Sequence, residues 1–97
     1  MIRSVKEVIR QRRAQMLVHS YLYYVLGESI VSDDKWQQWA DELESLQRDH
    51  PAECNIGFYD VEFRDWTGAT GMHLPKDDNV RAKADFLLRY SLGQYRR

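Results

Sequence analysis

The feature that most constrains this chain is a complete helix signature over residues 32–51, with a start signal, an apolar face and a stop signal. Ser32 is a typical N-cap, and Asp33 and Asp34 follow in the first turn, where the helix dipole favours acidic side chains. Pro51 cannot continue the helix. Five apolar residues between these ends recur at helical spacing and form one face: Trp36, Trp39, Ala40, Leu43 and Leu46. This helix must therefore bury one face against another element.

A long helix is predicted upstream, over residues 2–26. Neither Pro nor Gly interrupts this segment before Gly27, which is a natural helix stop. Its apolar stripe weakens at Arg12 and Arg13 and consists of Ile2, Val5, Val8, Ile9, Met16, Leu17 and Tyr24. Because the link at 27–31 is short, we expect the two helices to pack as an antiparallel or steeply crossed hairpin.

The pattern changes after Pro51. Apolar and charged side chains alternate from Tyr59 to Arg64, and this period of two predicts a short β-strand or extended segment. Asp77 or Asp78 can then cap a third helix over 79–92, which we expect Gly93 to end, with a loose tail after it.

The predicted fold class is therefore mainly α, in a single small domain over residues 1–97. The domain comprises a helical hairpin at 16–51, an extended or β insert at 52–76 and a C-terminal helix at 77–93.

Composition narrows the possible partners. The net charge is −1, which creates no overall field for nucleic acid, so direct nucleic-acid binding is not expected. The acids are concentrated in residues 28–65, which hold eleven acids against three bases, whereas residues 1–13 are basic. These charges either complement one another within the fold or stay solvated, or they form an acidic surface that docks a basic partner or mimics nucleic acid.

Two further properties bear on location. The chain has one cysteine, Cys54, so it forms no internal disulfide and suits a reducing cytoplasm. No apolar run approaches the roughly 18–20 residues of a membrane span. We therefore expect a cytoplasmic protein without a membrane partner.

No motif for metal binding or catalysis emerges from the residues themselves. The three histidines lie in different segments, without the spacing of metal ligands. The glycines at 68 and 71 lack the Lys and Ser/Thr of a phosphate-binding loop. We therefore predict neither a metal site nor catalytic residues.

Residues 15–51 read QMLVHSYLYYVLGESIVSDDKWQQWADELESLQRDHP, and the part from Met16 to Pro51 resembles a known family. Its aromatic helix end, Ser-Asp-Asp start and terminal His-Pro are similar to the N-terminal helical domain, domain Ia, of bacterial NAD-dependent DNA ligases. That domain carries an HxxYLYHV-type helix, an I-P-D-x-x-Y-D turn and a helix ending in HP. The resemblance implies a helical hairpin of the ligase type.

In that family, domain Ia closes over NAD and contacts its nicotinamide mononucleotide half. The register implies cofactor-binding residues at Tyr23, Tyr24, Asp33, Trp36 and Gln37. Tyr23 and Asp33 match the family, whereas Tyr24 replaces a His, Trp36 a Tyr and Gln37 an Asp. Loss of the imidazole and of one carboxylate implies a degraded site that binds NAD or nicotinamide mononucleotide weakly. The alternative is that Tyr23 and Trp36 are core residues and Asp33 is a helix-start acid.

The resemblance also bears on activity. The catalytic lysine of these ligases lies in a K-x-D-G motif of a separate domain, and the nearest sequence here, Lys83-Ala84-Asp85-Phe86, lacks the glycine. We therefore expect a stand-alone module without ligase activity of its own, and lean against an enzyme.

A second function stays open alongside nucleotide binding. The module would instead be a protein-interaction inhibitor or adaptor of a phage or prophage, using its acidic and aromatic surface. In either case we expect a protein partner, in a bacterial or phage-infected bacterial cell.

Overall fold

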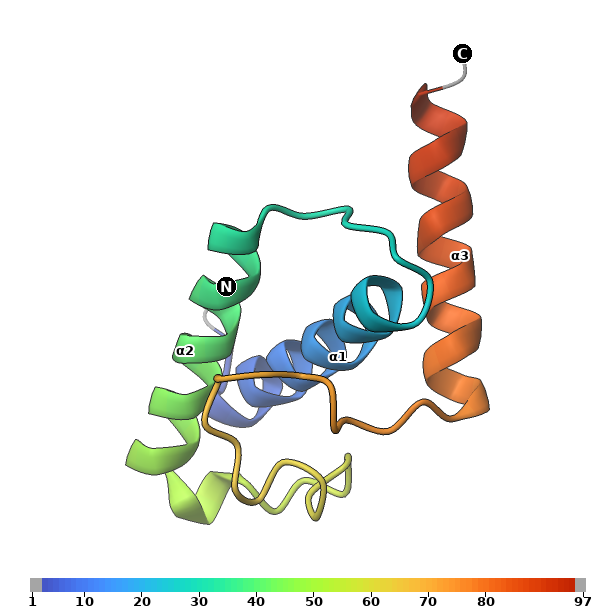
Figure 1. Cartoon of the computed structure of the whole chain (residues 1–97). Coiled ribbons are helices and arrows are strands. Elements are labelled where there is room, and N and C mark those ends of the chain that lie inside the picture. The colour runs from blue at the N-terminus through green and yellow to red at the C-terminus, as the bar shows by residue number, and fades with distance from the viewer. Residues whose placement is uncertain (1–2, 96–97) are drawn as a thin grey trace.

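A computed structural model describes residues 3–95 and contains three α-helices and one short 3-10 helix. The α-helices are α1 (Val5–Tyr24), α2 (Asp33–Asp49) and α3 (Asp78–Tyr95), and the 3-10 helix is η1 (Pro51–Glu53) (Figure 1). The described residues form no strand, so the prediction of a mainly α fold is confirmed. No helix within this range is both long and apolar enough to cross a membrane.

Helix α1 begins at Val5 because Ser4 caps it: the Ser4 Oγ accepts a hydrogen bond from the Glu7 amide at 3.2 Å. The predicted start at Ile2 lies outside the described residues. The predicted stop is confirmed, since Gly27 adopts a φ of 68° and the Glu28 amide bonds to the Leu22 carbonyl at 2.8 Å. A glycine in the left-handed conformation just past the last turn is a common helix end.

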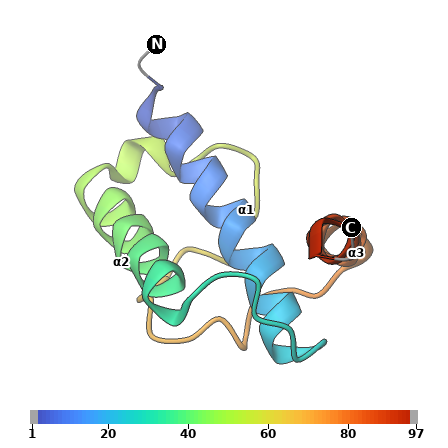
Figure 2. The ribbon, with the colours of Figure 1, turned by 90° about the horizontal axis from the view of Figure 1, so that it is seen from above.

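Helix α2 has the predicted start. The Ser32 Oγ accepts from the Lys35 amide at 3.1 Å. Ala40 and Leu43 on its apolar face are buried against α1, while the tryptophans of that face are partly buried. Figure 2 shows α2 running back along α1 in the opposite direction, and α1 lying between α2 and α3. The predicted hairpin is therefore present.

The strand expected between Tyr59 and Arg64 is wrong. These residues form consecutive turns, in which the Phe63 amide bonds to the Tyr59 carbonyl at 3.2 Å and Tyr59 has a φ of 54°. Phe63 is fully buried, but Val61 is 70% exposed, so the alternating apolar residues do not share a face.

The physical reason for this difference is Arg13 on α1, which is only 1% exposed. Its guanidinium donates to the Phe58 carbonyl at 2.7 Å, to the Cys54 carbonyl at 3.0 Å and to Asp60 Oδ1 at 2.7 Å. Because the chain wraps its carbonyls around this buried cation, it cannot extend. The arginine that weakens the apolar stripe in sequence thus organises the insert.

Asp60 completes this arrangement from the other side. Its carboxylate accepts from the amides of Gly57 at 2.9 Å and Ile56 at 3.3 Å, as well as from Arg13. Burial opposes the charge, but the bonds from Arg13 and the backbone outweigh it and lower the pKa of Asp60 below its usual value. Together with the Arg12–Glu42 pair at 3.2 Å, this supports charges that complement one another within the fold.

Helix α3 starts as predicted but continues past its predicted end. The Asp77 carboxylate caps it by accepting from the Val80 amide at 2.9 Å. Val80 and Ala84 are buried against α1. The helix runs through Gly93 to Tyr95, because an interior glycine costs only about 1 kcal/mol relative to alanine and need not break a helix. The last two residues of the predicted tail lie outside the described range.

Candidate functional site

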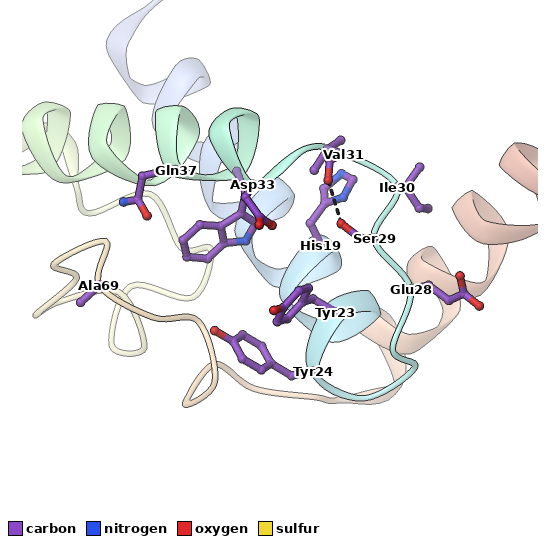
Figure 3. A pocket seen from close by; sticks show the side chains of 11 residues that line it. His19, Tyr23, Tyr24, Glu28, Ser29, Ile30, Val31, Asp33, Gln37 and Ala69 are labelled. Atoms are coloured by element: carbon purple, nitrogen blue, oxygen red, sulfur yellow. Dashed lines mark hydrogen bonds between the residues drawn. The ribbon is translucent and has the colours of Figure 1, made fainter.

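A pocket of about 220 Å³ lies at the end of the hairpin where the link joins the two helices, between the end of α1, the link and the start of α2 (Figure 3). Eleven residues line it: His19, Tyr23, Tyr24, Glu28, Ser29, Ile30, Val31, Asp33, Trp36, Gln37 and Ala69. The hairpin topology creates this pocket because the chain must cross from one helix to the other here. Ten of the eleven residues come from this crossing or its flanking turns.

All five residues predicted from the sequence line this one pocket. Tyr23 is 52% exposed and Tyr24 is 36% exposed, so neither belongs to the core. Their rings meet edge to face with centroids 4.9 Å apart. Trp36 is partly buried, and the centroid of its ring lies 6.4 Å from that of the Trp66 ring. The pocket therefore presents three aromatic rings on two helices.

Two carboxylates accompany these rings. Asp33 is the first residue of α2, directly after the Ser32 cap, and Glu28 lies in the link. Within residues 3–95, neither Lys nor Arg lines this pocket. The link is braced locally, since the Ser29 hydroxyl donates to the Val31 carbonyl at 2.9 Å. The pocket thus attracts a cation and disfavours an anion.

His19 contributes a neutral ring. It lies one helical turn before Tyr23, and its ring is 5.4 Å from that of Trp39. Burial disfavours the imidazolium and lowers the pKa of His19 below 6.5. At neutral pH this side chain therefore adds no positive charge to the pocket.

One wall comes from a distant part of the chain. The segment 67–72, here called the closing loop, reaches the pocket from beyond the hairpin and contributes Ala69. The Tyr24 hydroxyl and Thr70 Oγ1 are 3.1 Å apart, and Gln37 Nε2 donates to the Gly68 carbonyl at 3.0 Å. Gln37 Nε2 also donates to Asp41 Oδ1 at 2.9 Å.

Sequence reasoning missed six of the lining residues. His19 could have been found, because it is spaced one turn from Tyr23, and so could the link residues, because they join the two predicted halves of the site. No local signal marks Ala69, which approaches only through the fold of the insert.

A second hollow in the described molecule is already filled by an internal contact. A wider hollow of about 580 Å³ lies beside Arg13, but the guanidinium there is engaged by Gln47, Phe58, Asp60 and Cys54. Within residues 3–95, no three His, Cys, Asp or Glu side chains are grouped to hold a metal ion.

The profile of the family described as "DNA ligase-like, N-terminal NAD+-binding domain" matches residues 2–56. A DNA ligase of Bacteroides fragilis is 42% identical over 48 residues, and one of Pseudothermotoga lettingae is 33% identical over 48 residues. Each match covers 50% of this chain and 7% of the relative, so the chain spans a small part of the curated relatives that it matches. No solved structure matches the chain.

The family match includes ten of the eleven lining residues, all except Ala69. It begins earlier and ends later than the 16–51 stretch on which the resemblance rests. Because the match covers more than half of the chain, the chain belongs to the family of DNA ligase-like, N-terminal NAD+-binding domains.

Proposed function

We propose that the pocket binds the nicotinamide half of a pyridine nucleotide, as free nicotinamide mononucleotide or as part of NAD. One observation carries the proposal: three aromatic rings and two carboxylates line the pocket, and no basic side chain of the described residues does. The oxidised nicotinamide ring is a flat cation. Aromatic faces and carboxylates are the groups that bind such a cation.

The chemistry of the lining assigns a task to each group. Trp36 and Tyr23 offer faces for the ring, and cation–π attraction of this kind contributes about 0.5–2 kcal/mol. Asp33 offers carboxylate oxygens to the ring charge or to ribose hydroxyls. The volume of about 220 Å³ is below the roughly 300–1,000 Å³ of most ligand pockets, which fits half a dinucleotide better than a whole one.

The lining offers no ion pair to the phosphate of the ligand, because no Lys or Arg of the described residues lines the pocket. We therefore expect nicotinamide mononucleotide, nicotinamide riboside and NAD to bind with similar affinity. Their shared part is the ring with its ribose.

The test is a titration of the protein with nicotinamide mononucleotide, followed through the NMR signal of the Trp36 indole. We expect a saturable shift at millimolar or lower ligand. Asp33→Asn and Trp36→Leu should each weaken binding, because one removes the charge and the other the ring face. Absence of any shift at millimolar ligand would remove this function.

Two controls are matched to this design. Asp34→Asn changes the same residue type in the same turn of α2, but Asp34 does not line the pocket, so binding should be retained. NADH carries an uncharged ring, so it should bind more weakly than NAD. If both forms bind equally, the cation is not the recognised feature.

The 97-residue chain holds no K-x-D-G lysine, so we expect no transfer of adenylate from NAD to this chain and no nick sealing by it. Incubation with labelled NAD and magnesium, beside an intact ligase, tests this. Label retained on the chain after denaturation would contradict it.

Protein binding is the second candidate function, and one observation favours it. Phe86 is 72% exposed and Tyr90 is 59% exposed, one turn apart on α3, which leaves two aromatic side chains largely uncovered. Exposed aromatic side chains of this kind are enriched at protein interfaces. Replacing both by serine should abolish binding to a partner and leave nucleotide binding unchanged.

A further inference from the structure

We propose that the closing loop, residues 67–72, is a built-in wall of the nicotinamide pocket, and that Tyr24 and Gln37 are positioning residues that hold this wall in place. The inference rests on the proposed function, because the wall matters only if the pocket binds a ligand. Tyr24 and Gln37 differ from the residues of the ligase family at these positions. On this inference, the two differences do not only remove contacts with the ligand, because they also add contacts within the protein.

The first observation is which side chains reach the loop. Tyr24 meets Thr70 Oγ1 at 3.1 Å, and Gln37 donates to the Gly68 carbonyl at 3.0 Å. These are two of the positions at which the chain departs from the ligase pattern. The loop lies outside residues 2–56, so both departures join the family segment to a part of the chain beyond it.

The second observation is how closely the loop packs. A Cβ placed on Gly71 would clash with Ser20 Oγ and lie 3.3 Å from Trp36 Cζ2. Gly71 is buried, so its backbone lies directly on α1 and on the pocket tryptophan. Gly68 has a φ of 76° and would place a Cβ 3.3 Å from the Ala40 carbonyl. Only glycine fits both approaches without displacing the loop.

The loop is also shaped from within. The Thr70 Oγ1 that meets Tyr24 accepts from the Met72 amide at 3.2 Å, which is a turn of the Ser/Thr type. Thr70 therefore fixes the loop conformation and its attachment through one oxygen. The position of the closing loop therefore depends on Thr70 within the loop and on Tyr24 outside it.

Restoring the residue of the ligase family at position 37 should loosen the closing loop. An Asp at position 37 has no N–H to donate to the Gly68 carbonyl, and it would lie one helical turn from Asp41, where like charges repel. Although Gln37→Asp restores a carboxylate, it should release the loop. We therefore expect weaker nucleotide binding from this substitution, whereas a degraded ligand contact would give tighter binding.

The experiment compares the affinity for nicotinamide mononucleotide across single variants of the full chain. Gln37→Asp, Tyr24→Phe and Thr70→Val should each weaken binding about 3- to 10-fold, the equivalent of one net hydrogen bond. Thr70→Ser keeps the hydroxyl and should retain wild-type affinity. Gln38→Asp is the matched control, since it makes the same change at an exposed neighbour on α2 that does not line the pocket.

Two readouts make the result decisive. Amide hydrogen exchange of residues 68–72 should accelerate in Gln37→Asp and Thr70→Val but not in Gln38→Asp. The double variant Tyr24→Phe/Thr70→Val should bind no more weakly than Thr70→Val alone, because that substitution already removes the contact with Tyr24.

The outcomes separate this inference from the proposed function. No binding by the wild-type protein overturns both. Binding by the wild type together with equal or tighter binding by Gln37→Asp overturns the wall alone, as does unchanged amide exchange in the loop of that variant.

Discussion

At the scale of single residues, the buried Arg13 side chain holds residues 54–60 of the insert in their folded shape. Arg13 bonds to Gln47 on α2 and to Cys54, Phe58 and Asp60 in the insert, which lie 34 to 47 positions away in sequence. A guanidinium is suited to this role because its planar fork directs several N–H groups at once. A lysine could not satisfy these acceptors together.

Arg13→Ala should therefore destabilise the protein by about 3–5 kcal/mol, the usual cost of removing one partner of a buried ion pair. The variant leaves the Phe58 carbonyl and Asp60 without their cation. Urea unfolding followed by tryptophan fluorescence measures the loss. Arg48→Ala is the control, because Arg48 and Asp49 are both more than half exposed and such pairs contribute about 0–1 kcal/mol. Equal effects of the two substitutions would contradict the role of Arg13.

At the scale of elements, the features that local interactions determine could be predicted from the sequence, whereas those that distant residues determine could not. The helices were predictable because caps, stops and apolar spacing are local, and Ser32 and Gly27 act as expected. The turns at 59–64 were not, because Arg13 determines them from a distance. The five predicted site residues meet in one pocket because the hairpin brings them together, while Ala69 arrives only through the insert.

The apolar face of α2 gives the prediction at this scale. Leu43 is fully buried, so Leu43→Ala should cost about 2–5 kcal/mol through lost burial and the cavity left behind. For a domain of this size that corresponds to a fall in melting temperature of at least about 8 °C. Gln38→Ala on the exposed side of the same helix should stay within about 0.5 kcal/mol of wild type. Melting of Leu43→Ala within two degrees of wild type would show that the assigned face is wrong.

At the scale of the whole molecule, polar links join the irregular insert to the helices, in addition to its buried apolar side chains. The radius of gyration is 13.7 Å, slightly above the roughly 13 Å of a compact 100-residue domain, and α3 projects from the body in Figure 1. The Tyr59 hydroxyl donates to Asp77 at 2.7 Å and so joins the insert to the cap of α3. The Val80 amide, and then Tyr59, lower the pKa of Asp77.

Since the Asp60 and Asp77 carboxylates have lowered pKa values in the folded protein, we expect stability to depend on acidity in a defined direction. In the unfolded chain each of these carboxyl groups has its ordinary pKa of 3.8, and in the folded protein its pKa is lower. At a pH between the unfolded-state and folded-state pKa of a group, the unfolded chain therefore binds more protons than the folded protein. The stability that each carboxylate contributes is therefore fully present well above pH 4. It is lost as the pH falls below about 4 and through the folded-state pKa.

Asp60→Asn isolates one of these contributions, because the amide does not titrate and Asp77 is common to both proteins. We expect the wild type to be more stable than the variant by a constant amount between pH 7 and pH 5, since Asp60 is ionised in both states there. The difference should then shrink as the pH falls below about 4, where the wild-type carboxylate takes up its proton and loses the charge that Arg13 and the amides of residues 56–58 bind. Urea unfolding of both proteins at intervals from pH 7 to pH 2 measures this difference directly. A difference that stays constant to pH 2 would mean that Asp60 holds the insert without its charge, and that Arg13 is satisfied by the backbone carbonyls alone.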